Sequence, residues 1–94
     1  MSSRENQATD KRVGVVAIIV QDRNETYNEL NEILHQFSAI IIGRMGLPYR
    51  DRNISIIALI VDGSNEQVGA LSGKIGQLKN IHVKTMFAKL EPVS

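Results

Sequence analysis

The chain has 94 residues, of which 43% are hydrophobic and 22% are charged, and its formal net charge is +1. This length fits one domain of roughly 100 residues and leaves little space for a deep internal substrate cavity. The near-neutral charge argues against nonspecific binding to nucleic acid. The absence of cysteine excludes disulfides and thiolate chemistry, and it favours a cytoplasmic setting.

Residues 1–12 are polar and predict a disordered tail, which leaves one domain over 13–90 and a short C-terminal tail over 91–94. The longest apolar stretches, 13–20 and 54–61, are far shorter than the roughly 20 residues that a membrane-spanning helix needs. We therefore expect no membrane span.

The first half of the chain predicts a strand, a helix and a second strand. Residues 13–21 are rich in valine and isoleucine, which is typical of a strand buried on both faces. Asp22 and Glu25 form a carboxylate variant of the capping box at the start of a helix over 24–36. Its apolar residues recur at helical spacing: Tyr27, Leu30, Ile33, Leu34 and Phe37. Residues 39–45 predict the second strand.

The second half begins with a hairpin. Residues 46–53 contain the glycine, proline and charges of a loop that leads into a third, antiparallel strand over 54–62. Ser64 and Gln67 then form a capping box at the start of a second helix, whose apolar residues recur at helical spacing. Those apolar positions are Val68, Leu71, Ile75 and Leu78.

Residues 82–89 predict a final strand, in which Lys84 and Lys89 interrupt the apolar positions as expected for a protected edge. The element order is then βαββαβ, which is the ferredoxin-like α+β arrangement. In it, a four-stranded antiparallel sheet carries two helices on one face, with the first and third strands at its centre.

Two helices on one face leave the other face of this sheet uncovered, although both central strands are apolar on both sides. A bare apolar face of that size exceeds what monomers tolerate, so we expect it to pack on a second copy, as a homodimer or homotetramer. The pattern does not decide which set of side chains lies outside. The set assigned to the interface is Val16, Ile18, Val20, Ile57, Leu59 and Val61. The alternative set is Val13, Val15, Ala17, Ile19, Ile56, Ala58 and Ile60.

Three arginines, Arg44, Arg50 and Arg52, gather around the predicted hairpin, and together with Asp51 they give the segment 44–52 a charge of +2. Such clusters are usually solvated. Guanidinium groups also bind carboxylate or phosphate in two-pronged fashion, so these three residues are candidates for an anionic ligand.

The second helix contains Gly69-Ala70-Leu71-Ser72-Gly73-Lys74, which invites comparison with a phosphate-binding loop. The match fails, because only three residues separate the glycines and Ile75 follows the lysine. Glycine in a helix favours close packing, here against the sheet or a second subunit, with a ligand as the alternative. Gly73 and Lys74 therefore join the arginines as candidate ligand-binding residues.

No catalytic or metal centre can be assembled from spacing. His35 and His82 each lack a second ligand at metal spacing, so we expect no metal and no cofactor unless subunits share an ion. Neither central strand carries the aromatic residues with which ferredoxin-like domains stack RNA bases. We expect no enzyme activity and no direct RNA binding.

Four segments carry a family resemblance that extends over about 13–89: Leu34 to Ser38, Arg44 to Arg50, Gly69 to Gly76, and His82 to Thr85. With them the chain resembles small bacterial proteins known as iron-only hydrogenase system regulators. The family's fold is similar to ACT domains and to the ligand-binding half of the nickel-responsive repressor. Both are regulatory modules that assemble through sheets and helices and often hold small ligands between subunits.

The resemblance implies a non-catalytic, oligomeric regulatory module that is associated with an iron-only hydrogenase system. It would act through a small ligand or a protein partner; the alternative is a structural adaptor oligomer without a ligand. The repressor's DNA-binding half has no counterpart in the twelve residues before the first strand, and its histidine and cysteine metal ligands are missing. We therefore expect neither DNA contact nor nickel sensing.

Overall fold

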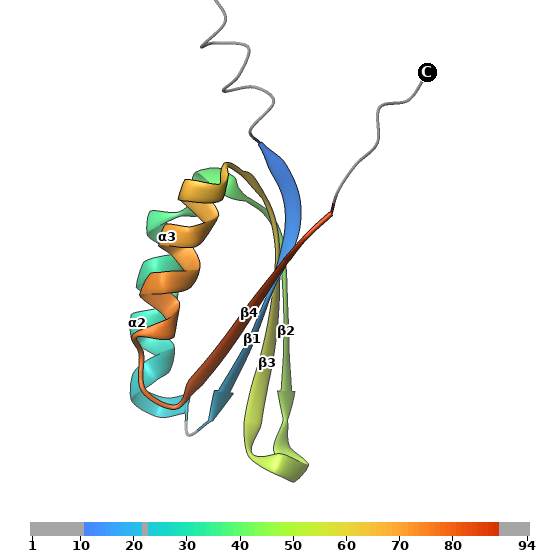
Figure 1. The fold of residues 1–94 in the computed structure, drawn as a ribbon. Coiled ribbons are helices and arrows are strands. Elements are labelled where there is room, and N and C mark those ends of the chain that lie inside the picture. Colours follow the sequence, from blue (N-terminus) through green and yellow to red (C-terminus); the bar gives the residue numbers. More distant parts are fainter. Residues whose placement is uncertain (1–10, 22, 89–94) are drawn as a thin grey trace, which may run out of the picture.

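The computed structural model describes residues 11–21 and 23–88. Its order of elements is βαββαβ, which confirms the ferredoxin-like prediction (Figure 1). The elements are β1 (Arg12–Gln21), α2 (Arg23–Gln36), β2 (Ile41–Tyr49), β3 (Ile54–Gly63), α3 (Asn65–Gly76) and β4 (Ile81–Phe87), with 3-10 turns η1 (Ser38–Ile40) and η2 (Arg50–Arg52). The tail predictions for 1–12 and 91–94 fall outside the described residues except at 11 and 12, and Arg12 already belongs to β1. The capping role of Asp22 also falls outside the described residues.

The four strands form one antiparallel sheet in the order β2-β3-β1-β4, so the two apolar strands β1 and β3 are central as predicted. Valine and isoleucine favour this position because their branched side chains pack well on a pleated surface. Both helices lie on the same side of the sheet, and no described element covers the other side (Figure 1). The sheet thus has one face under the helices and one open face.

The core lies between the sheet and the helices. It contains Leu30 and Leu34 of α2 and Val68, Leu71 and Ile75 of α3, all of which are buried. Their spacing of three or four residues puts them on one side of each helix. The sheet contributes Val16, Ile18, Val20, Ile57, Leu59 and Val61.

The capping box predicted at the start of α3 is confirmed. The Ser64 hydroxyl accepts a hydrogen bond from the Gln67 backbone N–H at 3.1 Å, and the Gln67 side-chain oxygen accepts one from the Ser64 N–H at 2.9 Å. Two N–H groups that the first helical turn leaves unpaired are thereby satisfied.

Long-range hydrogen bonds fix the connection between α3 and β4 against the first half of the chain. The buried Thr26 hydroxyl donates to the Lys79 carbonyl at 3.1 Å, and the Gln21 N–H donates to the Asn80 carbonyl at 2.8 Å. Asn80 has a φ of 59°, a left-handed conformation that asparagine tolerates better than most residues. This connection therefore anchors both the end of β1 and the first turns of α2.

The prediction for the hairpin is wrong in its boundaries. β2 continues through Gly46 and Pro48 to Tyr49, where the sequence predicted a loop, and only residues 50–53 form the turn. Proline is tolerated because β2 is an edge strand, where a missing backbone donor need not break a ladder on both sides. Asn53 closes the turn with a φ of 53°. The apolar strand pair is consequently longer than expected.

Candidate functional site

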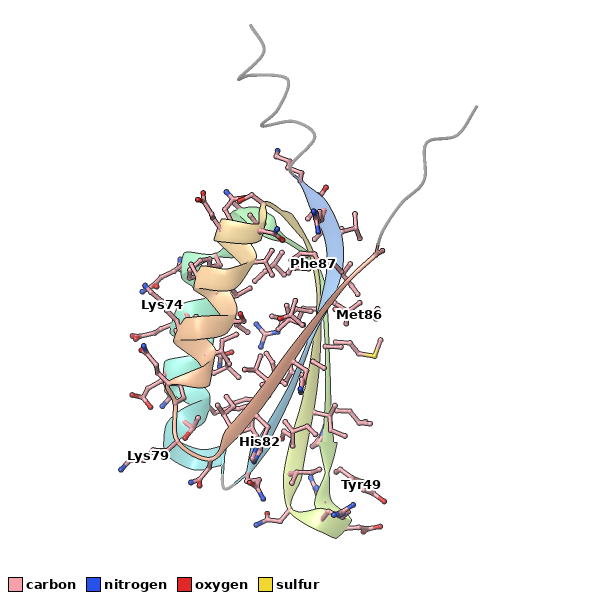
Figure 2. All side chains as sticks on the ribbon, viewed as in Figure 1. Tyr49, Lys74, Lys79, His82, Met86 and Phe87 are labelled. Carbon is pink, nitrogen blue, oxygen red and sulfur yellow. The ribbon has the colours of Figure 1, made fainter. Side chains whose placement is uncertain are left out.

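The open face of the sheet is apolar over β2, β3 and β1, and on β4 it includes Met86 beside the polar residues His82 and Lys84. The register aligns one set of alternate side chains, all on the side away from the core. Met45, Leu47 and Met86 are 70%, 59% and 63% exposed. Met86 and Tyr49 both point away from the helices (Figure 2). The full apolar set, called the open-face set below, is Val13, Val15, Ala17, Ile19, Met45, Leu47, Tyr49, Ile54, Ile56, Ala58, Ile60 and Met86.

The interface residues assigned from the sequence lie on the opposite face. Val16, Ile18, Val20, Ile57, Leu59 and Val61 are each 0 or 1% exposed and form the floor of the core beneath the helices. They cannot meet a second copy in the folded chain, so this assignment is wrong. Because successive side chains of a strand point to opposite faces, the alternative set is the exposed one.

The predicted ligand residues do not converge. Arg44 lies on β2 and donates a 3.0 Å hydrogen bond to the side-chain oxygen of Asn31 on α2. Arg50 and Arg52 are exposed in the turn η2 at the end of the hairpin. Lys74 lies on the helix side of the molecule, far from the hairpin tip marked by Tyr49 (Figure 2). A single site containing all five predicted residues is therefore ruled out within one chain.

Lys74 contacts residues at the end of α2. Its ammonium group donates to the Gln36 side-chain oxygen at 3.3 Å and stands 5.7 Å from the centre of the Phe37 ring. This distance is within the range of a cation–π interaction. Lys74 thus has a structural role in joining α3 to the end of α2.

A hollow of about 380 Å³ lies beside Arg44, between α2, η1 and β2. It is lined by Asn31, Leu34, His35, Ser38, Ile41 and Arg44. Arg44 was predicted from the sequence, but its neighbours in the hollow on α2 and η1 were not. Two of the segments that carry the family resemblance, 34–38 and 44–50, contain Leu34, His35, Ser38 and Arg44. The presence of both segments in the resemblance was the signal that could have linked residues 34–38 with Arg44.

A second hollow of similar volume follows the edge of β4. Its polar lining comes from His82 and Lys84, and a 2.9 Å hydrogen bond joins the His82 Nε2 to the side-chain oxygen of Gln21. The remaining lining is Ala17, Ile19, Gly76, Ile81 and Val83. This hollow borders the open face, so a second copy seated there would reach it.

The glycines of α3 are not explained by packing on the sheet. A Cβ atom added at Gly69 or Gly73 would meet nothing within 4 Å, and one at Gly76 would make an ordinary 3.6 Å contact with Val83. Packing against the sheet, as predicted from the sequence, is therefore wrong for Gly69 and Gly73. Contact with a second subunit stays a prediction.

Gly69→Ala and Gly73→Ala are each expected to raise the free energy of unfolding by up to about 1 kcal/mol, because alanine loses less backbone entropy in a helix. Chemical denaturation measures this. Gly14→Ala is the control, since its Cβ would lie 2.7 Å from the Met86 carbonyl oxygen and should destabilise the chain. A loss of stability at Gly69 or Gly73 would show instead that this helix side contacts another molecule.

Residues 11–21 and 23–88 contain no group of three histidine, cysteine or acidic side chains close enough to hold a metal ion. Over the same residues, no helix is long and apolar enough to cross a membrane.

The sequence model of the TM1266-like family matches residues 12–85, and the name of this family suggests a regulator of an iron-only hydrogenase system. The chain belongs to this family. The match includes both hollows and nearly all of the open face, so these features lie within the family's domain. A search of curated proteins finds no match.

Solved structures agree with this membership. The uncharacterized protein TM1266 from Thermotoga maritima is 44% identical, with a TM-score of 0.81, over 84% of this chain and 99% of that one. The ACT domain of the GTP pyrophosphokinase from Chlorobium tepidum has a TM-score of 0.68 at 17% identity, over 81% of this chain and 99% of that domain. The fold is therefore ACT-like.

A part of a larger enzyme shares the fold more distantly. A formyltetrahydrofolate deformylase from Pseudomonas putida KT2440 has a TM-score of 0.58 at 7% identity, over 82% of this chain and 29% of that one. The likeness covers less than a third of the deformylase, so it concerns the fold of one region only.

Proposed function

We propose that this chain is a non-catalytic regulatory module of an iron-only hydrogenase system, and that it works as an assembly of its own copies joined through the open face. The observation that carries the proposal is the open-face set, which is continuous over β2, β3 and β1 and reaches Met86 on β4. The family description supports the regulatory role, and the ACT-like fold is consistent with it. The cytoplasm is the proposed setting, because a chain without cysteine needs no oxidising compartment.

A second copy is the occupant that fits this face best. Contiguous apolar patches beyond a few hundred Å² are rare on monomers, and a face that must always be covered favours a partner made together with the chain. The side chains at its centre are small, because Ala17 and Ala58 stand opposite each other in the register. Small central side chains permit the separation of about 10 Å at which two sheets stack.

The charges of the face lie at its margins, where they would remain in water. Lys84 and His82 lie on the edge strand β4, and Asp62 lies near the end of β3. A polar rim around an apolar centre is the usual anatomy of a protein interface. An adaptor oligomer without a small ligand would use the same face. A measurement of ligand binding therefore distinguishes the adaptor from a regulator that binds a small ligand.

Ala17→Arg is expected to break the assembly while the chain stays folded. The substitution places a large charged side chain at the exposed centre of the face, where a second copy would have to bury it without a partner. We expect association to weaken at least about a hundredfold, measured by sedimentation velocity and native mass spectrometry.

The control is Ala70→Arg, which adds the same side chain at an exposed position of α3. It should leave both association and stability unchanged, since arginine is a good helix former. A wild-type chain that sediments as a monomer at high concentration would overturn the proposal, and so would an Ala17→Arg variant that still assembles.

A further inference from the structure

The hollow beside Arg44 has the size and walls of a small-molecule site. Its volume of about 380 Å³ is near the lower end of the range of such sites, about 300–1,000 Å³. Three elements that are separate in the sequence, α2, η1 and β2, each contribute to it. A site of this size accommodates a molecule of a few carbon atoms.

Arg44 gives this hollow a positive charge that no described side chain neutralises. Its described partner is the neutral amide oxygen of Asn31, which accepts from one terminal nitrogen and holds the guanidinium in place. Among the side chains that the structure describes, no carboxylate lies within ion-pair distance of Arg44. The remaining guanidinium N–H groups are free to form a two-pronged contact with an anion.

The other walls divide into an apolar and a polar side. Leu34, which is 3% exposed, and the half-buried Ile41 form the apolar side. The hydroxyl of Ser38 and the imidazole of His35 add hydrogen-bonding groups, and none of the described lining residues is acidic. A ligand that matches both sides carries an acidic group and a short apolar chain.

We propose that this hollow binds a small organic acid, with its carboxylate paired to Arg44 and its carbon chain against Leu34 and Ile41. This adds a ligand site to the regulatory module proposed above, yet it does not depend on the assembly. Arg44 stands opposite the buried Leu59 in the register, so it lies on the helix side of β2. A second copy on the open face leaves the hollow accessible.

The test is an NMR titration of the isotopically labelled full chain with acetate, butanoate and inorganic phosphate, following the Arg44 side-chain N–H signals. We expect saturable shifts, with butanoate bound more tightly than acetate by up to about fifteenfold, since each buried CH2 contributes up to about fourfold. Phosphate should bind more weakly than butanoate, because it has no apolar part to contact Leu34.

Arg44→Gln should abolish the butanoate shifts, whereas Arg52→Gln, which removes an exposed arginine of the hairpin turn, should leave them unchanged. Both variants should keep the wild-type melting temperature. Shifts that persist in Arg44→Gln, phosphate binding tighter than butanoate, or no saturable shift with any probe would each overturn the proposal. Sedimentation of the same samples reports the assembly separately, so a lost ligand site with intact association counts against this inference alone.

Discussion

Leu59→Asp is expected to unfold the protein at room temperature, whereas Ile60→Asp, one position along the same strand, is expected to give a folded chain that no longer associates. Leu59 is fully buried between the sheet and the helices, and Ile60 belongs to the open-face set at 36% exposure. An unpaired carboxylate in the core costs several kcal/mol, comparable with the roughly 5–15 kcal/mol that stabilises a typical domain.

Circular dichroism checks folding in both variants, and sedimentation velocity checks association in the one that folds. The pair is matched in chemistry and strand, so the difference reports which face each side chain occupies. If Ile60→Asp unfolded and Leu59→Asp stayed folded, the assignment of the two faces would be reversed. If both remained folded and associated, the open face would not be the contact between copies.

The order of the elements was predictable because it depends on local patterns. The valine and isoleucine runs of β1 and β3, the capping box at Ser64 and the helical spacing in α3 each specify their element without distant contacts. The connection rules then place the two apolar strands at the centre of the sheet. None of these patterns depends on which side of a strand is covered by the helices.

The choice of face failed because both sides of the central strands are apolar. The edge strand β4 contains the missing information: it alternates between Ile81 or Val83 on the core side and His82 or Lys84 on the open side. In the register, Lys84 stands opposite Ala17 and Val83 opposite Ile18. Once strand pairing is known, the polar residues of β4 therefore place Ile18 in the core. The sequence alone does not show which residues of β1 and β4 pair.

The candidate ligand site was predictable only in part, because its geometry depends on tertiary packing. Arg44 was identified by its charge, but its contact with Asn31 depends on how α2 packs beside β2. Lys74 was a candidate because it follows the glycines of the second helix, and the structure instead places it against Gln36 and Phe37. Residue type indicated which chemistry was available, while the helix packing determined which groups meet.

Leu71→Ala is expected to lower the free energy of unfolding by about 2–5 kcal/mol, the usual cost of truncating a buried leucine. Leu71 is fully buried where α3 packs on the sheet, and its neighbours in the core include Val68 and Ile75 of the same helix. Since about 1 kcal/mol shifts the melting temperature of a domain this size by about 4–8 °C, the shift should be at least about 8 °C. Scanning calorimetry measures it.

Leu47→Ala is the matched control, because the same truncation is made at a leucine that is 59% exposed on the open face. Within a single chain it removes little buried surface, so any effect must come through association and must grow with protein concentration, since only the assembled state gains from the contact. Leu71→Ala should instead show the same loss at every concentration, because it weakens each chain's own core. Equal, concentration-independent losses in the two variants would mean that Leu47 packs within its own chain, and the open face would then not be a surface between copies.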